Sequence, residues 1–394
     1  MTTAIKNRSV YFSFPSTPVA RVFHQIRTTT SDRTLLQKQL GYSQASITRH
    51  VGALIDAGLV EETSPKAVVD SRAGRPRITL GINGRHLVFW GAHIGVSSTE
   101  IVIADAGGRT LRHKRLSLAT TRRSPEEQID TVARELAALG HDLADPIDIG
   151  VAFSSHVTRD GVLNSTEYGW HDVDIATILE QAFGRPVPVT TGVLAMAGSE
   201  VTDTPLSEAN GLPAPGANPV LPSTLYFYAR EVVSHAWIFN GVVHQPHSGK
   251  APSAFFAGRG ALDAHGPGEQ TSPLSVAPIL DEATRLGLRA SNFADLVALS
   301  AHSPSIRKRF EERAVVLSDA VAAAVDVVDP EVVVFAGEAF TLDPATLKST
   351  VARLRDCAHT ATRLRIQQAG HNIISRAAIQ VALNRFRADP LQFV

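Results

Sequence analysis

The chain has 394 residues, of which 44% are hydrophobic and 19% charged, so it is long enough for two or three domains with cores of their own. Its only cysteine is Cys357, which excludes a disulfide framework or a thiolate zinc site within one chain. The sequence shows neither a signal-peptide pattern nor an apolar run of membrane-spanning length. We therefore expect a cytoplasmic protein with no membrane partner.

Charge is divided unevenly along this chain, which is neutral as a whole. Residues 1–90 contain 12 Lys and Arg against 5 Asp and Glu, a net charge of +7, and the remainder carries −7. A basic head followed by an acidic body indicates that the head binds a polyanion. Its affinity should fall steeply with salt, because binding releases counterions.

The first forty residues predict an arm and two helices. Residues 1–15 have no clear hydrophobic period, and we expect them to form a mobile arm. Pro18 suits the first turn of a helix, Ser31-Asp32 suits a helix cap, and Gly41 suits the turn that follows. The apolar positions are Val19, Val22, Phe23 and Ile26 in the first helix, and Leu35, Leu36 and Leu40 in the second.

Residues 43–60 predict a third helix and the start of a β-hairpin. Ile47, Val51, Leu54 and Ile55 form one apolar stripe at helical spacing, and Gly58 ends the helix before Leu59-Val60 begins a strand. Three helices and a hairpin are typical of a winged helix-turn-helix, whose last helix enters the DNA major groove. The alternative is a three-helix bundle without a nucleic-acid role. The candidate DNA-binding residues here are Ser43, as the cap, and Gln44, Ser46, Thr48 and Arg49.

A short basic segment follows where the tip of the wing is expected. Arg72, Arg75 and Arg77 surround Gly74 and Pro76, so the local chain is extended and presents three guanidinium groups. Arginines presented in this way suit a narrow, electronegative minor groove. The alternative is a solvated basic loop between two domains.

From residue 86 onward the pattern becomes that of an α/β protein. Gly107-Gly108 predicts a hairpin turn between two strands, and a helix follows it. The predicted strands are residues 86–95, 100–105, 147–153 and 186–189, and the predicted helices are residues 124–140 and 173–183.

This order of elements resembles the ROK family (repressors, open reading frames and sugar kinases). The resemblance implies an α/β fold in which an N-terminal winged helix-turn-helix precedes a two-lobed, actin-like ATPase body. It places the DNA-binding domain at residues 1–85, a first lobe at 86–190, and a second lobe at 191–394 whose C-terminal helix returns to the first. The matching segments are the helix-turn-helix, Ala73-Gly-Arg-Pro76, the first β-hairpin, Tyr168-Gly-Trp170, Ile175–Glu180, Gly184–Val187 and Asp329–Gly337.

The resemblance also shows where this chain departs from the family's kinases. Their first phosphate loop reads Asp-x-Gly-Gly-Thr, which here is His93-Ile-Gly-Val-Ser97. Their catalytic base lies in Asn-Asp-x-Asn, which here is Thr190-Thr-Gly-Val193. A threonine cannot accept a proton from a sugar hydroxyl near pH 7. The second, glycine-rich phosphate loop corresponds to Glu231–Ala236, which has no glycine. We therefore expect no enzymatic activity and no catalytic residues.

The family's zinc and sugar signature is missing as well. The positions of its Glu and its zinc-binding His hold Ser253 and Phe256, and no cysteine follows before Cys357. We expect no metal site and no cofactor. The alternative is a different metal held by the scattered histidines His235, His244, His247 and His265.

The loss of the sugar-contacting carboxylates predicts an effector other than a hexose. Hydroxyls, imidazoles and an arginine suit a small anionic or zwitterionic metabolite, such as an amino-acid precursor. For each residue taken singly, ordinary hydrogen bonding at a strand end is an equally good reading. The candidate effector-binding residues are Ser154, Ser155, His156, Thr190, Thr191, Arg230 and His235.

Three functions remain open from the sequence. The first is a transcriptional regulator whose kinase-like body senses a metabolite and whose partner is double-stranded operator DNA. The second is an active kinase with a displaced base, and the third is a DNA-binding regulator that ignores ligands. For the regulators we expect a homodimer, or a homotetramer, on a pseudo-palindromic operator.

Overall fold

The computed structural model divides into two compact units. Unit 1 contains Met1–Leu221, Asn240–Gln245 and Ile374–Val394, and unit 2 contains Pro222–Phe239 and Pro246–Ile373. The structure describes residues 10–63, 78–118, 120, 123–165, 167–206, 220–230, 233–246, 276–290, 293–357, 362–367 and 373–394.

Unit 1 begins with three short helices and a two-stranded antiparallel sheet, which we call the head. Each helix starts at a residue whose side chain caps it: Thr17 accepts from the Ala20 amide, Asp32 from Leu35, and Ser43 from Ser46. Gly41 has a φ of 69°, so it takes the left-handed turn between the second and third helices at little cost. The elements are α1 (Pro18–Thr28), α2 (Arg33–Leu40), α3 (Gln44–Asp56), β1 (Val60–Thr63) and β2 (Thr79–Ile82).

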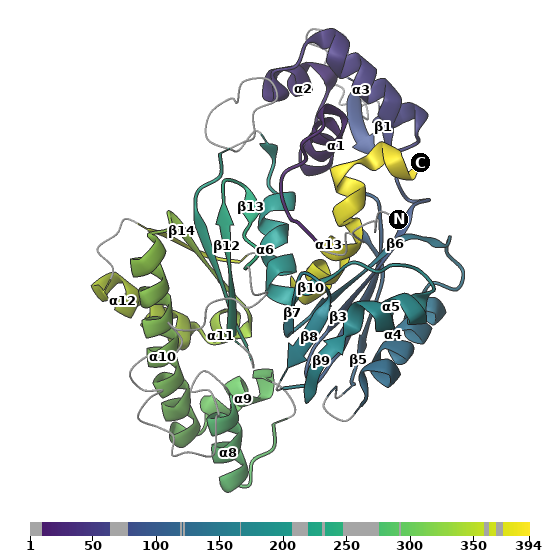
Figure 1. Cartoon of the computed structure of the whole chain (residues 1–394). Coiled ribbons are helices and arrows are strands. Elements are labelled where there is room, and N and C mark those ends of the chain that lie inside the picture. The colour runs from purple at the N-terminus through teal and green to yellow at the C-terminus, as the bar shows by residue number, and fades with distance from the viewer. Residues whose placement is uncertain are drawn as a thin grey trace, which may run out of the picture. The chain divides into compact units, whose positions relative to one another are not determined.

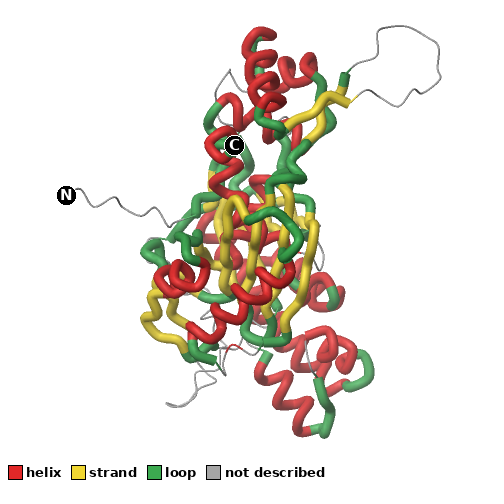
Figure 2. The backbone as a smooth tube through the Cα atoms, turned by 90° about the vertical axis from the view of Figure 1, so that its right-hand side faces the viewer, coloured by secondary structure: helices red, strands yellow, loops and turns green. Residues whose placement is uncertain are grey.

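The predicted apolar stripe forms much of the core of the head. Ile47, Val51 and Leu54 are fully buried, whereas Ile55 is only half-buried. β1 pairs with β2 in the register Val60↔Ile82, and Figure 2 shows this ribbon beside the three helices. The segment between the two strands, which includes Arg72, Arg75 and Arg77, lies outside the described residues.

Residues 10–17 form an extended segment that packs against the rest of unit 1. Val10, Phe12 and Phe14 are buried, and the Phe12 carbonyl accepts a hydrogen bond from the Val243 amide at 2.9 Å. The side chain of Asn384 donates to the Tyr11 carbonyl at 2.8 Å. The expectation of a mobile arm is therefore wrong for residues 10–15, because alternate side chains of this segment are apolar and buried.

A five-stranded sheet in the order β10-β6-β3-β4-β5 forms the centre of unit 1 (Figures 1 and 2). β3 is antiparallel to β4 and parallel to β6, and β10 is parallel to β6. The carboxyl ends of β3, β6 and β10 therefore meet at one edge. The strands are β3 (Val88–Ile94), β4 (Thr99–Asp105), β5 (Thr110–Leu116), β6 (Pro146–Phe153) and β10 (Val189–Thr191).

Helices cover both faces of this sheet. α4 (Pro125–Leu139) and α5 (Ile175–Phe183) pack on one face through a single hydrophobic core. α13 (Ile373–Ala388) lies directly on the other face, where a Cβ atom at Gly91 would be 2.6 Å from the Ala378 backbone. Glycines on the central strands thus allow the α13 backbone to approach closely.

The segment after α5 differs from the sequence prediction. The strand predicted at residues 186–189 is β10 at Val189–Thr191, because its pairing with β6 runs from Val189↔Val151 to Thr191↔Phe153. A mostly buried helix, α6 (Gly192–Thr202), follows at once. A small sheet in the order β7-β8-β9 and a short strand complete unit 1: β7 (His156–Val157), β8 (Val162–Ser165), β9 (Trp170–Asp174) and β13 (Val242–Val243).

Unit 2 is a second α/β layer in which β11 pairs with β12 on one side and β14 on the other, followed by β15. Its core lies between this sheet and the long helix α10 (Pro304–Val328). No helix in the described part of the chain is long and apolar enough to cross a membrane. The remaining elements are β11 (Thr224–Ala229), β12 (Val233–Phe239), β14 (Val332–Ala336), β15 (Arg363–Ile366), α8 (Ala277–Arg285), α9 (Phe293–Ser300), α11 (Glu338–Thr341) and α12 (Pro344–Cys357).

One histidine in α1 is held neutral by its surroundings. His24 is 4% exposed, its Nε2 lies 2.8 Å from the Thr204 carbonyl, and its ring meets Phe14 edge-on. Burial, with the nearby charge of Arg27, lowers the pKa of His24 from 6.5 to about 3.

This shift predicts a loss of stability in mild acid. Below about pH 6.5 the unfolded chain takes up a proton at His24 that the folded protein refuses until about pH 3, so stability falls as the pH drops through this window. We expect this residue to contribute up to about 1.4 kcal/mol per pH unit to the unfolding free energy. Urea unfolding of the parent and of His24→Gln across about pH 7 to 4 measures the effect. Parallel pH profiles would contradict it.

Candidate functional site

The outer face of α3 is exposed and polar. Gln44, Thr48 and Arg49 are exposed, while the Ser43 hydroxyl accepts from the Ser46 amide at 3.2 Å and Ser46 is half-buried. Ser43 and Ser46 therefore order the start of the helix, and the other three side chains are available to a partner. Recognition helices of helix-turn-helix proteins likewise contact base edges through their N-terminal residues.

The structure adds Gly52 to this face, a residue that the sequence analysis missed. A Cβ atom built there meets nothing within 4 Å, so packing within the protein does not require a glycine. Its spacing from Thr48 and Arg49, four and three residues on, was the available signal. A bare helix surface at this position lets another backbone approach closely.

A second polar group lies at the shared carboxyl edge of β3, β6 and β10. Ser154, Ser155 and His156 follow β6 and are half-buried, whereas Thr190 and Thr191 in β10 are 5% and 9% exposed. In open α/β sheets, ligands bind beyond the carboxyl ends of the strands. Unit 1 thus brings five of the seven predicted effector residues to one edge.

Hydrogen bonds fix several of these groups. The Thr191 hydroxyl accepts from the Val157 amide at 3.1 Å, and the Ser155 hydroxyl donates to the Asn164 carbonyl at 3.1 Å. The Ile94 carbonyl accepts from the Ser154 amide at 2.8 Å and from the Tyr168 hydroxyl at 2.7 Å. Thr191 and Ser155 therefore help to fix the backbone at this edge.

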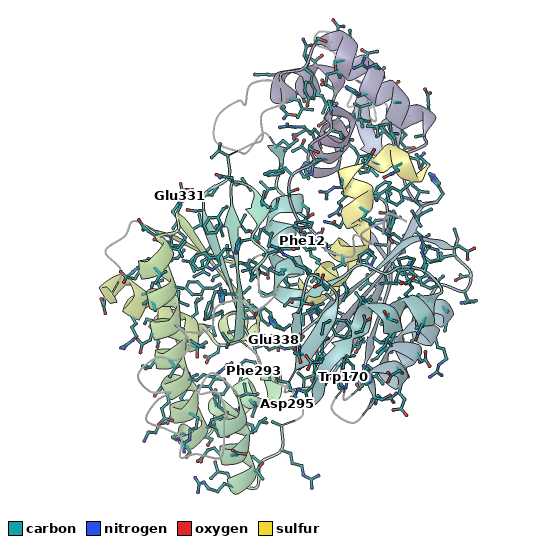
Figure 3. All side chains as sticks on the ribbon, in the orientation of Figure 1. Phe12, Trp170, Phe293, Asp295, Glu331 and Glu338 are labelled. Atoms are coloured by element: carbon teal, nitrogen blue, oxygen red, sulfur yellow. The ribbon has the colours of Figure 1, made fainter. Side chains whose placement is uncertain are left out.

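The buried Tyr168 side chain contacts this edge through its hydroxyl group. Its ring is 2% exposed and meets Trp170 edge-on, and Figure 3 marks the position of Trp170. Burial raises the pKa of the Tyr168 hydroxyl well above its usual range, so it stays protonated and donates to Ile94. The turn carrying Ser154 is thereby held in place.

His93 belongs to the same edge, although the sequence analysis did not include it among the site residues. It is 2% exposed, and a Cβ atom at Gly192 would lie 2.5 Å from its Nε2 atom. The imidazole therefore occupies the space at the first residue of α6, and only a glycine at position 192 leaves room for it. The replacement of an acidic residue by His93 was visible in the sequence, but its contact with Gly192 was not.

The remaining two predicted effector residues lie in unit 2. His235 pairs with Phe227 across β11 and β12, so both side chains point to the face that α10 covers, and His235 meets Trp237 edge-on. Burial lowers the pKa of His235 to about 4, which keeps it neutral. This placement favours a packing role for His235. Arg230 is buried at the end of β11, and its carbonyl accepts a hydrogen bond from Arg313.

Metal ligands do not gather in the described part of the chain. Among those residues, no group of three or more His, Cys, Asp or Glu side chains is placed to hold a metal ion. His247 and His265, and the positions Ser253 and Phe256, lie outside the described residues.

The chain is similar in sequence to known proteins over most of its length. The model of the ROK family matches residues 89–210. The chain is 31% identical over 384 residues to the protein named transcriptional regulator Rv0485 of Mycobacterium tuberculosis, covering 91% of this chain and 83% of that protein. It has the same similarity to transcriptional regulator Mb0495 of Mycobacterium bovis.

Two solved structures show how much of the fold is shared. A ROK family transcriptional regulator described as a homologue of the E. coli MLC protein has a TM-score of 0.68 at 17% identity, covering 95% of this chain and 98% of its own. A ROK family glucokinase from Streptomyces griseus, solved with glucose and AMPPNP, has a TM-score of 0.60 at 17% identity and covers 75% of this chain and 99% of its own.

Proposed function

Because this chain belongs to the ROK family of transcriptional regulators, we propose that it binds operator DNA through a winged helix-turn-helix head and regulates metabolic genes. The observation that carries this proposal is the capped helix α3, whose Gln44, Thr48 and Arg49 side chains are exposed together. The ribbon of β1 and β2 follows where a wing is expected. The charge of +7 on residues 1–90 supplies the attraction to DNA phosphates.

The body serves, in this proposal, as a metabolite sensor without phosphoryl-transfer activity. The end of β10 offers the hydroxyls of Thr190 and Thr191 where a kinase of this family needs a carboxylate. Thr191 is engaged by the Val157 amide, and neither hydroxyl can act as a general base near pH 7. The imidazole of His93 fills the neighbouring space against Gly192.

We propose a small anionic or zwitterionic ligand rather than a hexose. Ser154 and His156 present a hydroxyl and an imidazole at the strand edge of unit 1. Such groups pair with carboxylates or phosphates better than with the paired hydroxyls of a sugar. His235 is not part of this proposed set, because its side chain lies on the face covered by α10.

The proposed assembly is a homodimer, or a homotetramer, in the cytoplasm, where the DNA partner is. Two recognition helices related by a two-fold axis need half-sites about 10 base pairs apart, or a multiple of that spacing. Duplexes selected from a random pool by the purified protein would test this directly. A pseudo-palindromic consensus, with affinity that falls steeply with salt, is the expected result. Failure to enrich any sequence would overturn the proposal.

Two further assays separate the alternatives. ATP turnover with a panel of sugars should stay at background, since measurable phosphorylation would make the body a kinase.

A thermal-shift screen of metabolites separates a sensor from a ligand-independent regulator, because a ligand that binds only the folded state raises the melting temperature. We expect anionic metabolites, and not glucose, to raise it.

A further inference from the structure

The end of α1 meets the end of α6 at a carboxylate in unit 1. Asp203 caps the C terminus of α6, and its Oδ1 accepts from Arg27 Nη1 at 3.1 Å. Arg27 belongs to the head, its side chain is only 7% exposed, and its Nη2 also donates to the Thr202 carbonyl. The head is thus attached to α6 through side-chain and backbone acceptors together.

α13 contributes the other half of this junction. Asp203 Oδ2 accepts from Arg376 and, at 3.4 Å, from Gln380 Nε2. Gln380 Oε1 in turn accepts from the Thr202 hydroxyl at 2.9 Å and from Arg387. Three elements far apart in the sequence therefore share one hydrogen-bonded cluster.

The Asp203 carboxylate offsets the positive charges of the arginines in this cluster. Burial by itself would raise the pKa of Asp203, but the guanidinium groups of Arg387, Arg27 and Arg376 together hold it below its usual range. Burial, with the charge of Arg27, lowers the pKa of Arg387 to about 9. Without the Asp203 charge, these guanidinium groups would repel one another in a poorly solvated site.

α6 connects this junction to the strand edge described above. The helix begins at Gly192, directly after Thr191, and ends next to Asp203, a length of about 16 Å for its eleven residues. Ten of those residues are buried, so neighbouring side chains resist its bending. The helix is therefore a tightly packed element that joins the end of β10 to Asp203.

α6 also touches the segment that leads into α1. A Cβ atom at Gly198 would lie 2.5 Å from the Phe12 ring, so the ring rests on the bare helix surface. Figure 3 marks Phe12 at this position. Through Phe12 and Arg27, α6 contacts both the segment before α1 and the last turn of α1.

We propose that Asp203 is a positioning residue that fixes the head on the rest of unit 1, and that α6 transmits the state of the strand edge at Thr191 to the head. The roles of the head in DNA binding and of the strand edge in ligand binding rest on the proposed function. The coupling between these two regions through α6 and Asp203 does not depend on either role. It can therefore be tested without DNA and without a ligand.

The test is amide hydrogen exchange on the full-length Asp203→Asn variant, which keeps the shape of the side chain and removes its charge. Amides of α1 should exchange at least about tenfold faster than in the parent, while those of β3 and β6 stay unchanged. The matched control is Asp142→Asn, which removes an exposed partner of Arg112 away from α6 and should leave α1 unchanged. Parent-like exchange in α1 of Asp203→Asn would overturn the proposal.

A milder variant decides the outcome if Asp203→Asn loosens the whole unit. The Arg376 side chain is 45% exposed, so Arg376→Gln should fold while still losing its contact with Asp203. Faster exchange confined to α1 would support the proposal. Unchanged exchange in α1 would overturn it.

A double-mutant comparison tests the transmission from Thr191 through α6 to the head. Thr191→Val removes the hydroxyl that the Val157 amide contacts, so it perturbs the start of α6. We expect it to change α1 exchange by about threefold in the parent background and not at all in Asp203→Asn. Equal effects in the two backgrounds would refute transmission through Asp203. A parent protein that binds no DNA would refute the proposed function and leave these exchange results intact.

Discussion

Arg49→Ala should weaken binding to a selected operator duplex by about 1–3 kcal/mol, a rise in Kd of about fivefold to 150-fold. Arg49 is exposed on the outer face of α3, one residue after Thr48 and within the first two turns after the Ser43 cap. A recognition helix reaches base edges from its N-terminal residues, and the bidentate contact of Arg or Lys to guanine is the commonest specific contact there. Fluorescence anisotropy at fixed salt measures the change.

The matched control for this variant is Arg134→Ala. Arg134 is an exposed helical arginine on α4, so the substitution removes the same charge from a surface with no proposed role in DNA binding. We expect its affinity for the selected duplex to remain at the parental value. If both variants lose equal affinity, or if Arg49→Ala weakens selected and random DNA alike, Arg49 does not read sequence.

Gly150→Ala should destabilise unit 1 by about 3 kcal/mol, the upper part of the range for overpacking. The new Cβ would lie 2.5 Å from the carbonyl carbon of Val381 and closer still to the Ala382 amide nitrogen. These are backbone atoms of α13, which cannot rotate away as a side chain can. The helix must therefore move off the sheet, and thermal or urea unfolding would record the loss.

Gly52→Ala is the control for this experiment, since it makes the same chemical change in open space. A Cβ at Gly52 meets nothing within 4 Å, and alanine in a helix interior is favoured over glycine by about 1 kcal/mol. This variant should be as stable as the parent or more stable. Equal stability of Gly150→Ala and the parent would show that α13 does not approach the sheet as closely as described.

Local signals in the sequence accounted for the elements of the head. The cap at Ser43, the stripe of Ile47, Val51 and Leu54, and the turn at Gly41 act within a few residues, so their pattern predicted helix positions well. Strand limits were predicted less well. β10 begins at Val189 because its pairing with β6, and not its own apolar residues, sets where it starts.

The candidate ligand site was only partly visible in the sequence. Strand order brought Ser154 and Thr190 to one edge, as the order of elements implied, but strand register turned His235 towards α10. A side-chain period of two means that register decides which face each residue occupies. Pairing cannot be read from one strand alone, so the face that His235 occupies became clear only from its register with Phe227.

By itself the sequence determined the kinds of element and the chemistry at strand ends, because caps, turns and hydrophobic periods depend on neighbouring residues. Only the tertiary structure decided that Arg27, Asp203 and Arg387 share one cluster, and that residues 10–15 pack rather than move freely. Asp203 lies 176 residues from Arg27 along the chain. Contacts over such separations arise from packing and desolvation in the folded state, which leave no periodic trace in the sequence.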